Sequence, residues 1–230
     1  MLIDIIQNAI RGQQMDLGEV VSQILATLFV IFCILPIHEW AHARAAASLG
    51  DNTAKLQGRM SLNPLVSFDP VGAMFLLLFG FGWAKPVPID SRYFKNPKRD
   101  TALTALAGPV SNLIAGLAGA LILFGIIAGA GGMPNMLYYF LLAYIQINVA
   151  LAVFNLIPLP PLDGSKILGA FLSDRALYNY YRYQNIIITI AFFVLLFGIL
   201  DIPLMALQTF FSQIILWLGK LPYVLLGLLR

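Results

Sequence analysis

Residues 20–42 have the sequence VVSQILATLFVIFCILPIHEWAH, an apolar run that ends in two histidines and a glutamate. The part before His38 carries no charge and approaches the roughly 20 residues that a helix needs to cross a membrane. Ionisable side chains at the edge of such a helix are costly and are therefore functional by default. This stretch predicts a membrane-embedded fold with a site at His38, Glu39 and His42.

The composition of the chain agrees with a membrane protein. Of its 230 residues, 60% are hydrophobic and 11% are charged, whereas soluble domains carry about 25% charged residues. The net charge of +3 is small and no long Lys/Arg run exists, which favours the lipid bilayer over nucleic acid as a partner. No polar stretch is long enough for a separate soluble domain, so we interpret residues 1–230 as one membrane-embedded domain.

Charge-free runs predict an all-α, multi-pass membrane protein with about five transmembrane helices. The runs are Val20–Ile37, Thr101–Leu162, which is long enough for two spans, Tyr183–Leu200 and Ile202–Gly219. Val71–Ala84 is also free of charge but is too short to span comfortably, so we expect a re-entrant segment there.

This arrangement places all Lys and Arg residues except Arg11 on one side of the membrane, including Lys220 and Arg230. The positive-inside rule assigns that side to the cytoplasm. The first span and the third, at about 138–157, then both run from outside to inside and end at the same level. We therefore expect a multi-pass protein of a cell membrane, most naturally a bacterial one, with its site near the cytoplasmic side.

His38 and His42 are the only two histidines of the chain. Helical residues four apart differ by about 40° around the axis, so both imidazoles point the same way. This is the spacing by which two ligands hold one Zn²⁺, with the intervening Glu39 beside the metal-bound water. The alternative is a chance match in which both histidines are satisfied in a helical core.

A catalytic zinc site needs a third protein ligand and an open position. The only other glutamate, Glu19, lies upstream, and Cys33 lies about 140° round the helix from His38. The best remaining candidate is Asp163, which follows a proline-rich stretch, residues 158–161, that must be unwound. Asp163 could also cap a helix over residues 165–172, and the two roles do not exclude each other.

Two asparagines lie within helices of the long charge-free run. Asn155 either donates to a developing oxyanion or to the substrate backbone, or it binds carbonyls that the prolines leave free. Asn112, in the sequence Gly108-Pro109-Val110-Ser111-Asn112, is better explained as a polar contact between closely packed helices.

Together these motifs resemble those of the site-2 protease family of intramembrane zinc metalloproteases. The resemblance covers about residues 20–175, which we interpret as the catalytic core, and we expect C-terminal helices to follow it over residues 183–230. The motifs that carry the resemblance are His38–His42, Gly108–Asn112, Asn155–Gly164, Gly82–Pro88 and Leu62–Pro70. One departure is Phe68, where many bacterial relatives carry a histidine before Asp-Pro. No PDZ or CBS domain fits in this length, so we expect a minimal member.

The resemblance implies that His38, His42 and Asp163 bind one Zn²⁺ per chain, that Glu39 is the general base, and that Asn155 assists substrate or oxyanion binding. It implies a metalloendopeptidase that hydrolyses peptide bonds within or near transmembrane segments of single-pass membrane proteins, in regulated intramembrane proteolysis. The sequence indicates neither the physiological substrate nor an oligomeric state.

A substrate helix must unwind before it is cut, so we expect extended or β segments on the cytoplasmic side, around 54–62 or 82–90, to offer an edge for strand addition. Two other classes of function stay open. A membrane transporter or metal carrier would share the broken helices, but it does not need Glu39, and no inverted repeat is apparent. A proteolytically silent homologue would bind membrane partners only, which the intact ligand set disfavours.

Overall fold

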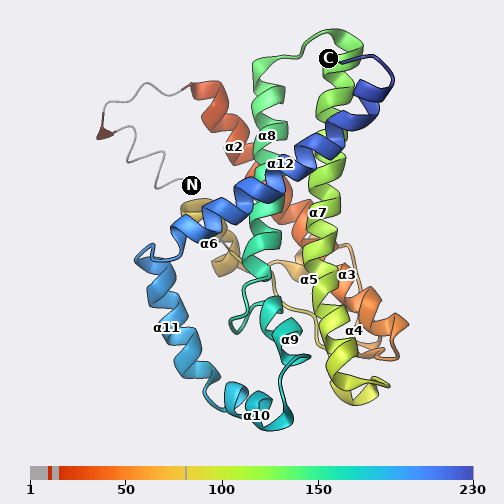
Figure 1. The fold of residues 1–230 in the computed structure, drawn as a ribbon, viewed down its shortest axis with the longest axis vertical. Coiled ribbons are helices and arrows are strands. Elements are labelled where there is room, and N and C mark those ends of the chain that lie inside the picture. Colours follow the sequence, from red (N-terminus) through yellow and green to blue (C-terminus); the bar gives the residue numbers. More distant parts are fainter. Residues whose placement is uncertain (1–9, 12–15, 81, 230) are drawn as a thin grey trace.

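The computed structural model describes residues 10–11, 16–80 and 82–229, and within them all regular secondary structure is helical (Figure 1). The N-terminal third holds α2 (Leu17–Phe29), a π-helical turn η1 (Val30–Ile34), α3 (Leu35–Ser48), α4 (Thr53–Leu56), α5 (Pro64–Ser67) and α6 (Pro70–Phe79). The rest holds η2 (Ser91–Tyr93), α7 (Pro97–Ala130), α8 (Asn135–Asn155), α9 (Asp163–Gly169), α10 (Asp174–Arg182), α11 (Gln184–Leu196) and α12 (Asp201–Leu225).

In the part of the chain that the structure describes, four helices are long and apolar enough to cross a membrane: Leu17–Ser48, Pro97–Ala130, Asn135–Asn155 and Asp201–Leu225. The prediction of an all-helical chain with several candidate spans is therefore confirmed, but these described residues hold four such helices in place of about five. The predicted span at 183–200 contains α11, whose 13 residues reach only about 20 Å across a core of roughly 30 Å. The ten-residue α6 is likewise too short to span, as expected for the charge-free segment Val71–Ala84, in which most of this helix lies.

The helices α7 and α8 form the centre of the bundle, with α2, α3 and α12 packed around them (Figure 1). Ile145 and Val149 of α8 and Leu123 of α7 are fully buried in this core. Glycines allow the close helix contacts: a Cβ on Gly219 of α12 would lie 2.5 Å from the Cβ of Ala120. Small residues at such contacts are typical of helices that pack in a membrane.

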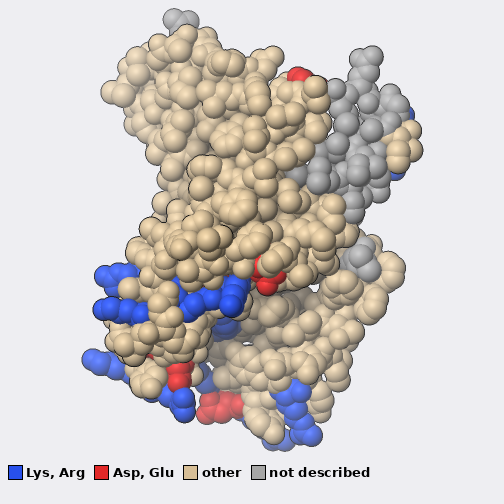
Figure 2. All heavy atoms as spheres, turned by 180° about the vertical axis from the view of Figure 1, so that it is seen from behind, with Lys and Arg blue, Asp and Glu red and all other residues tan. Residues whose placement is uncertain are grey.

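The position of the C-terminal helix α12 differs from the prediction that Lys220 lies on the basic side of the membrane. The Tyr223 hydroxyl donates to the Leu121 carbonyl at 2.9 Å, and Leu121 lies about 36 Å along α7 from Pro97 at 1.5 Å per residue. Most Lys and Arg on the face shown in Figure 2 gather at the other, lower end of the molecule. The assignment of Lys220 to the basic side is therefore wrong, because α11 is too short to add a separate crossing; Arg230 lies outside the described residues.

The predicted β segments are absent from the part of the chain that the structure describes. Residues 54–56 belong to α4, and residues 82–90 have no regular secondary structure. Pro86 and Pro88 have no N–H to donate to a ladder. The N–H of Lys85 donates to the Ser67 carbonyl at 2.9 Å, and the N–H groups of Val87 and Asp90 donate to the carboxylates of Glu39 and Asp51.

Candidate metal centre

The helix α3 presents His38, Glu39 and His42 at the end of the long N-terminal helical segment. Its first turn contains Pro36, where a missing N–H is tolerated, and it follows the π-helical turn Val30–Ile34 directly. Extra-residue turns of this kind occur frequently beside functional sites. All three side chains are buried, with relative exposures of 4% for each histidine and 7% for Glu39.

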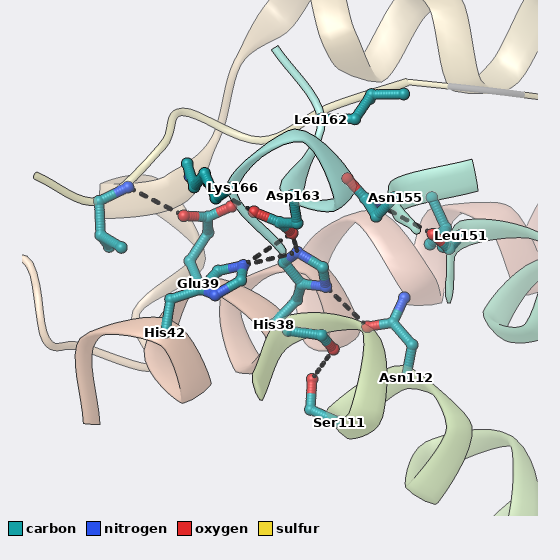
Figure 3. Close-up of polar contacts among 12 residues, drawn as sticks. His38, Glu39, His42, Ser111, Asn112, Leu151, Asn155, Leu162, Asp163 and Lys166 are labelled. Carbon is teal, nitrogen blue, oxygen red and sulfur yellow. Dashed lines mark hydrogen bonds and ion pairs between the residues drawn. The ribbon is translucent and has the colours of Figure 1, made fainter. Parts of the chain in front are cut away.

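Asp163 joins the two histidines from another part of the chain (Figure 3). The helix α8 ends at Asn155, and the Pro-rich loop that follows leads into α9, whose first residue is Asp163. Because Leu162 is the N-cap of α9, Asp163 does not cap the helix, and its carboxylate is turned towards the histidines. His38, His42 and Asp163 together form a buried group that could hold a metal ion.

The distances within this group fit a tetrahedral ion. The Nε2 atoms of His38 and His42 lie 3.1 Å apart. Oδ2 of Asp163 lies 3.4 Å from Nε2 of His38 and 3.0 Å from Nε2 of His42. Three ligand atoms at about 2.05 Å from a tetrahedral zinc ion would lie about 3.3 Å from one another. The structure thus already holds the three atoms at the separation that coordination requires.

Hydrogen bonds on the other side of each ring leave the Nε2 atoms as ligands. Nδ1 of His42 lies 2.8 Å from the Thr104 carbonyl oxygen, and Nδ1 of His38 lies 3.0 Å from Oδ1 of Asn112. Both oxygens can only accept, so both Nδ1 atoms donate, and in the neutral form of each ring the Nε2 atom then carries the lone pair. Two lone pairs and a carboxylate oxygen facing one another is an arrangement that a bound cation stabilises.

Glu39 is held by the segment that follows α6. Its Oε2 accepts a hydrogen bond from the Val87 N–H at 2.9 Å. Pro86 and Pro88 flank this donor, so Val87 supplies the one backbone N–H of the three residues. The segment is anchored in turn by Asp51, whose Oδ2 accepts from the Asp90 N–H at 2.7 Å.

A cavity of about 370 Å³ opens beside these residues. Its walls are the metal-binding group with Glu39, residues 82–89, the loop 157–162 and one face of α11. Asn155 also lines it, and its Nδ2 donates to the Leu151 carbonyl at 2.9 Å, within its own helix and not to the proline-rich loop. Lys166 also lines the cavity, with Nζ 3.4 Å from Oδ1 of Asp163. Cys33 is exposed and takes no part in the group.

Sequence reasoning missed how α7 contributes to this site. Thr104, Gly108 and Asn112 recur every four residues and share one face of α7, which packs against the two histidines. A Cβ on Gly108 would lie 2.3 Å from Nε2 of His42, so only glycine allows this approach. The motif Gly108–Asn112 was visible in the sequence, but its partner helix was not.

Comparisons with known proteins agree with this geometry. The model of "Peptidase family M50" matches residues 124–198, a region that contains Asp163. Over 151 residues the chain is 44% identical to "Putative zinc metalloprotease YwhC" of Bacillus subtilis, covering 63% of this chain and 67% of that protein. It is 27% identical over 222 residues to "Putative zinc metalloprotease Rip2" of Mycobacterium tuberculosis (strain Erdman), covering 92% and 78%. No solved structure matches the chain.

Proposed function

The chain belongs to peptidase family M50 and is a zinc metalloprotease, and on that premise we propose that it cuts peptide bonds within or near the transmembrane segments of other membrane proteins. The observation that carries the proposal is the position of the metal-binding group. His38, His42 and Asp163 are buried beside a cavity, within a bundle whose long helices could span a membrane.

The residues divide the reaction between them. A zinc ion held by His38, His42 and Asp163 would polarise the scissile carbonyl and acidify a water molecule. Glu39 accepts the proton of the attacking water and delivers it to the leaving amine. Its hydrogen bond from Val87 occupies one carboxylate oxygen and leaves the other for this transfer. Asn155 has two amide N–H groups, and the one not used by Leu151 is available to the developing oxyanion.

Single-pass membrane proteins are the proposed substrates. The cavity that holds the site is bordered by α11 and by residues 82–89, so an extended stretch of substrate fits it better than a regular helix, whose carbonyls are already hydrogen-bonded. Gly or Pro near the cut lowers the cost of unwinding by roughly 1–3 kcal/mol per residue relative to Ala. We therefore expect cleavage of helices that contain such residues, near the basic, cytoplasmic side of a bacterial cell membrane.

The test uses the full chain in lipid vesicles with a single-pass reporter that has a Gly-Ser pair near its cytoplasmic end. Wild type should contain one zinc ion per chain and cleave the reporter. His42→Ala should lose both properties, whereas Glu39→Gln should keep zinc and lose cleavage, because only the proton acceptor is removed. Replacing Gly-Ser by Leu-Leu should slow cleavage at equal reporter binding.

The same measurements distinguish a protease from a metal carrier and from a proteolytically silent homologue. A metal carrier would transport zinc into vesicles, and Glu39→Gln would not change that transport. A silent homologue would bind zinc and the reporter without cleaving it. Equal zinc content in wild type and His42→Ala would remove the metal assignment, and an unchanged rate with Leu-Leu would remove helix unwinding from the selectivity.

A further inference from the structure

Asn112 is the least explained of the buried polar residues around the site. It lies in the middle of α7 with no exposed surface, and its Oδ1 lies 3.0 Å from Nδ1 of His38. Figure 3 shows this contact on the side of the His38 ring that faces away from Asp163. Among the described residues, its Nδ2 has no hydrogen-bond partner.

The contact joins α7 to α3, as expected for a polar residue between closely packed helices, but joining helices alone does not explain why the acceptor faces His38. A polar residue that joins helices would use its donor as well as its acceptor, since a buried amide without a partner costs about 1–3 kcal/mol. Leucine at this position would avoid that cost. Among the described residues the Asn112 side chain makes its hydrogen bond to His38, so the contact with the histidine is what the amide provides.

We infer that Asn112 is a positioning residue for the zinc ligand His38, an inference that rests on the proposed function. By accepting the Nδ1–H, Asn112 selects the tautomer whose Nε2 lone pair faces His42 and Asp163. It also fixes the rotation of the ring about its Cβ–Cγ bond. Partners of this kind, outside the ligand shell, typically contribute a factor of about 10–100 to metal affinity.

A neutral amide accepts the Nδ1–H of His38 without placing a further charge at a fully buried position, where an ionised group is costly. A carboxylate at position 112 would accept the same hydrogen bond but would add a negative charge. An aliphatic side chain would leave Nδ1 of His38 without an acceptor and release the choice of tautomer.

Asn148 offers a matched control. It is as fully buried as Asn112, it lies on the neighbouring helix α8, and its Nδ2 donates to the Tyr144 carbonyl at 2.9 Å within that helix. Its Oδ1 has no partner among the described residues. Asn148 therefore matches Asn112 in burial and in having one unpaired polar atom, but no hydrogen bond links it to a ligand.

The experiment measures zinc affinity of the full chain by competition with a chelator, and the absorption spectrum of the Co²⁺-substituted protein. Asn112→Leu should weaken zinc binding about 10–100-fold and change the Co²⁺ spectrum. Asn112→Asp, which restores the acceptor, should recover most of the affinity, and Asn148→Leu should leave both readouts as in wild type.

Unchanged affinity in Asn112→Leu would overturn the inference, as would equal losses in Asn112→Leu and Asn112→Asp or an equal loss in Asn148→Leu, which would indicate only disturbed packing. His42→Ala separates this failure from failure of the proposed function. If His42→Ala loses zinc while Asn112→Leu does not, the metal site stands and only the role of Asn112 is wrong.

Discussion

The two walls of the cavity are built differently. On one wall, α3 and α9 carry the three buried residues of the metal-binding group, and each has a polar partner: Asn112 and the Thr104 carbonyl of α7 contact the histidines, and Lys166 contacts Asp163. On the opposite wall, α11 packs most extensively with the neighbouring α10, and Phe193 on that helix is about half exposed. In Figure 1, α11 stands apart from the central helices. If the proposed function holds, metal binding depends on the packed core and substrate contact on a peripheral element, so substitutions should separate the two.

The largest effect is expected at the closest approach of the ligand wall. Gly108→Ala would place a Cβ 2.3 Å from Nε2 of His42, so α7 must move away and the ligand atoms must separate. Overpacking of this kind costs about 1–3 kcal/mol, and we expect nearly complete loss of zinc, measured by mass spectrometry of the purified protein. Gly129→Ala on the same helix, where a Cβ would meet nothing within 4 Å, is the control. Full zinc content in Gly108→Ala would contradict this close packing.

A smaller effect is expected at Asp51, which anchors the segment 82–90 that holds Glu39. Its carboxylate is fully buried and accepts the N–H groups of Thr53 and Asp90 at 2.9 and 2.7 Å. Asp51→Ala should release the segment that donates to Glu39, at a cost of about 1–3 kcal/mol per unpaired N–H.

We expect Asp51→Ala to lower kcat about tenfold, equivalent to roughly 1.4 kcal/mol, with zinc content retained. Single-turnover cleavage and metal analysis of the same sample measure the two quantities. Asp174→Ala removes a carboxylate that is exposed and paired with Lys98 at the surface, and it should change neither. Parallel loss of zinc and turnover in Asp51→Ala would show that the segment 82–90 supports the metal-binding group as well as Glu39.

The smallest effect is expected on the α11 wall itself. Ala191 lines the cavity, and Ala191→Leu would fill part of it without touching a ligand. KM for the reporter should rise several-fold, about 1 kcal/mol, while zinc content stays the same. Ala206→Leu, at an exposed position of α12, makes the same change in size outside the cavity. A KM that rises equally in both variants would place the effect in the membrane and not in the cavity.

The sequence by itself determined that His38 and His42 share one face of a helix, because the spacing of residues on one helix is a local property. It also made Asp163 the best candidate for a third ligand, and the structure brings these three side chains together. Matching directions of the first and third long helices brought Asp163 to the same end of the bundle. The roles of Glu39 and Asn155 in the reaction stay predictions, and the structure places both side chains in the lining of the cavity.

Only the tertiary structure decided the number of long helices, the position of the C-terminal end and the role of α7. The count of charge-free runs cannot show that α11 is too short to cross, or that Tyr223 packs against Leu121 at the end of α7 remote from the basic side. Gly108 and Asn112 were visible as a motif but not as neighbours of the histidines, because contacts between helices far apart in sequence follow from packing and not from periodicity.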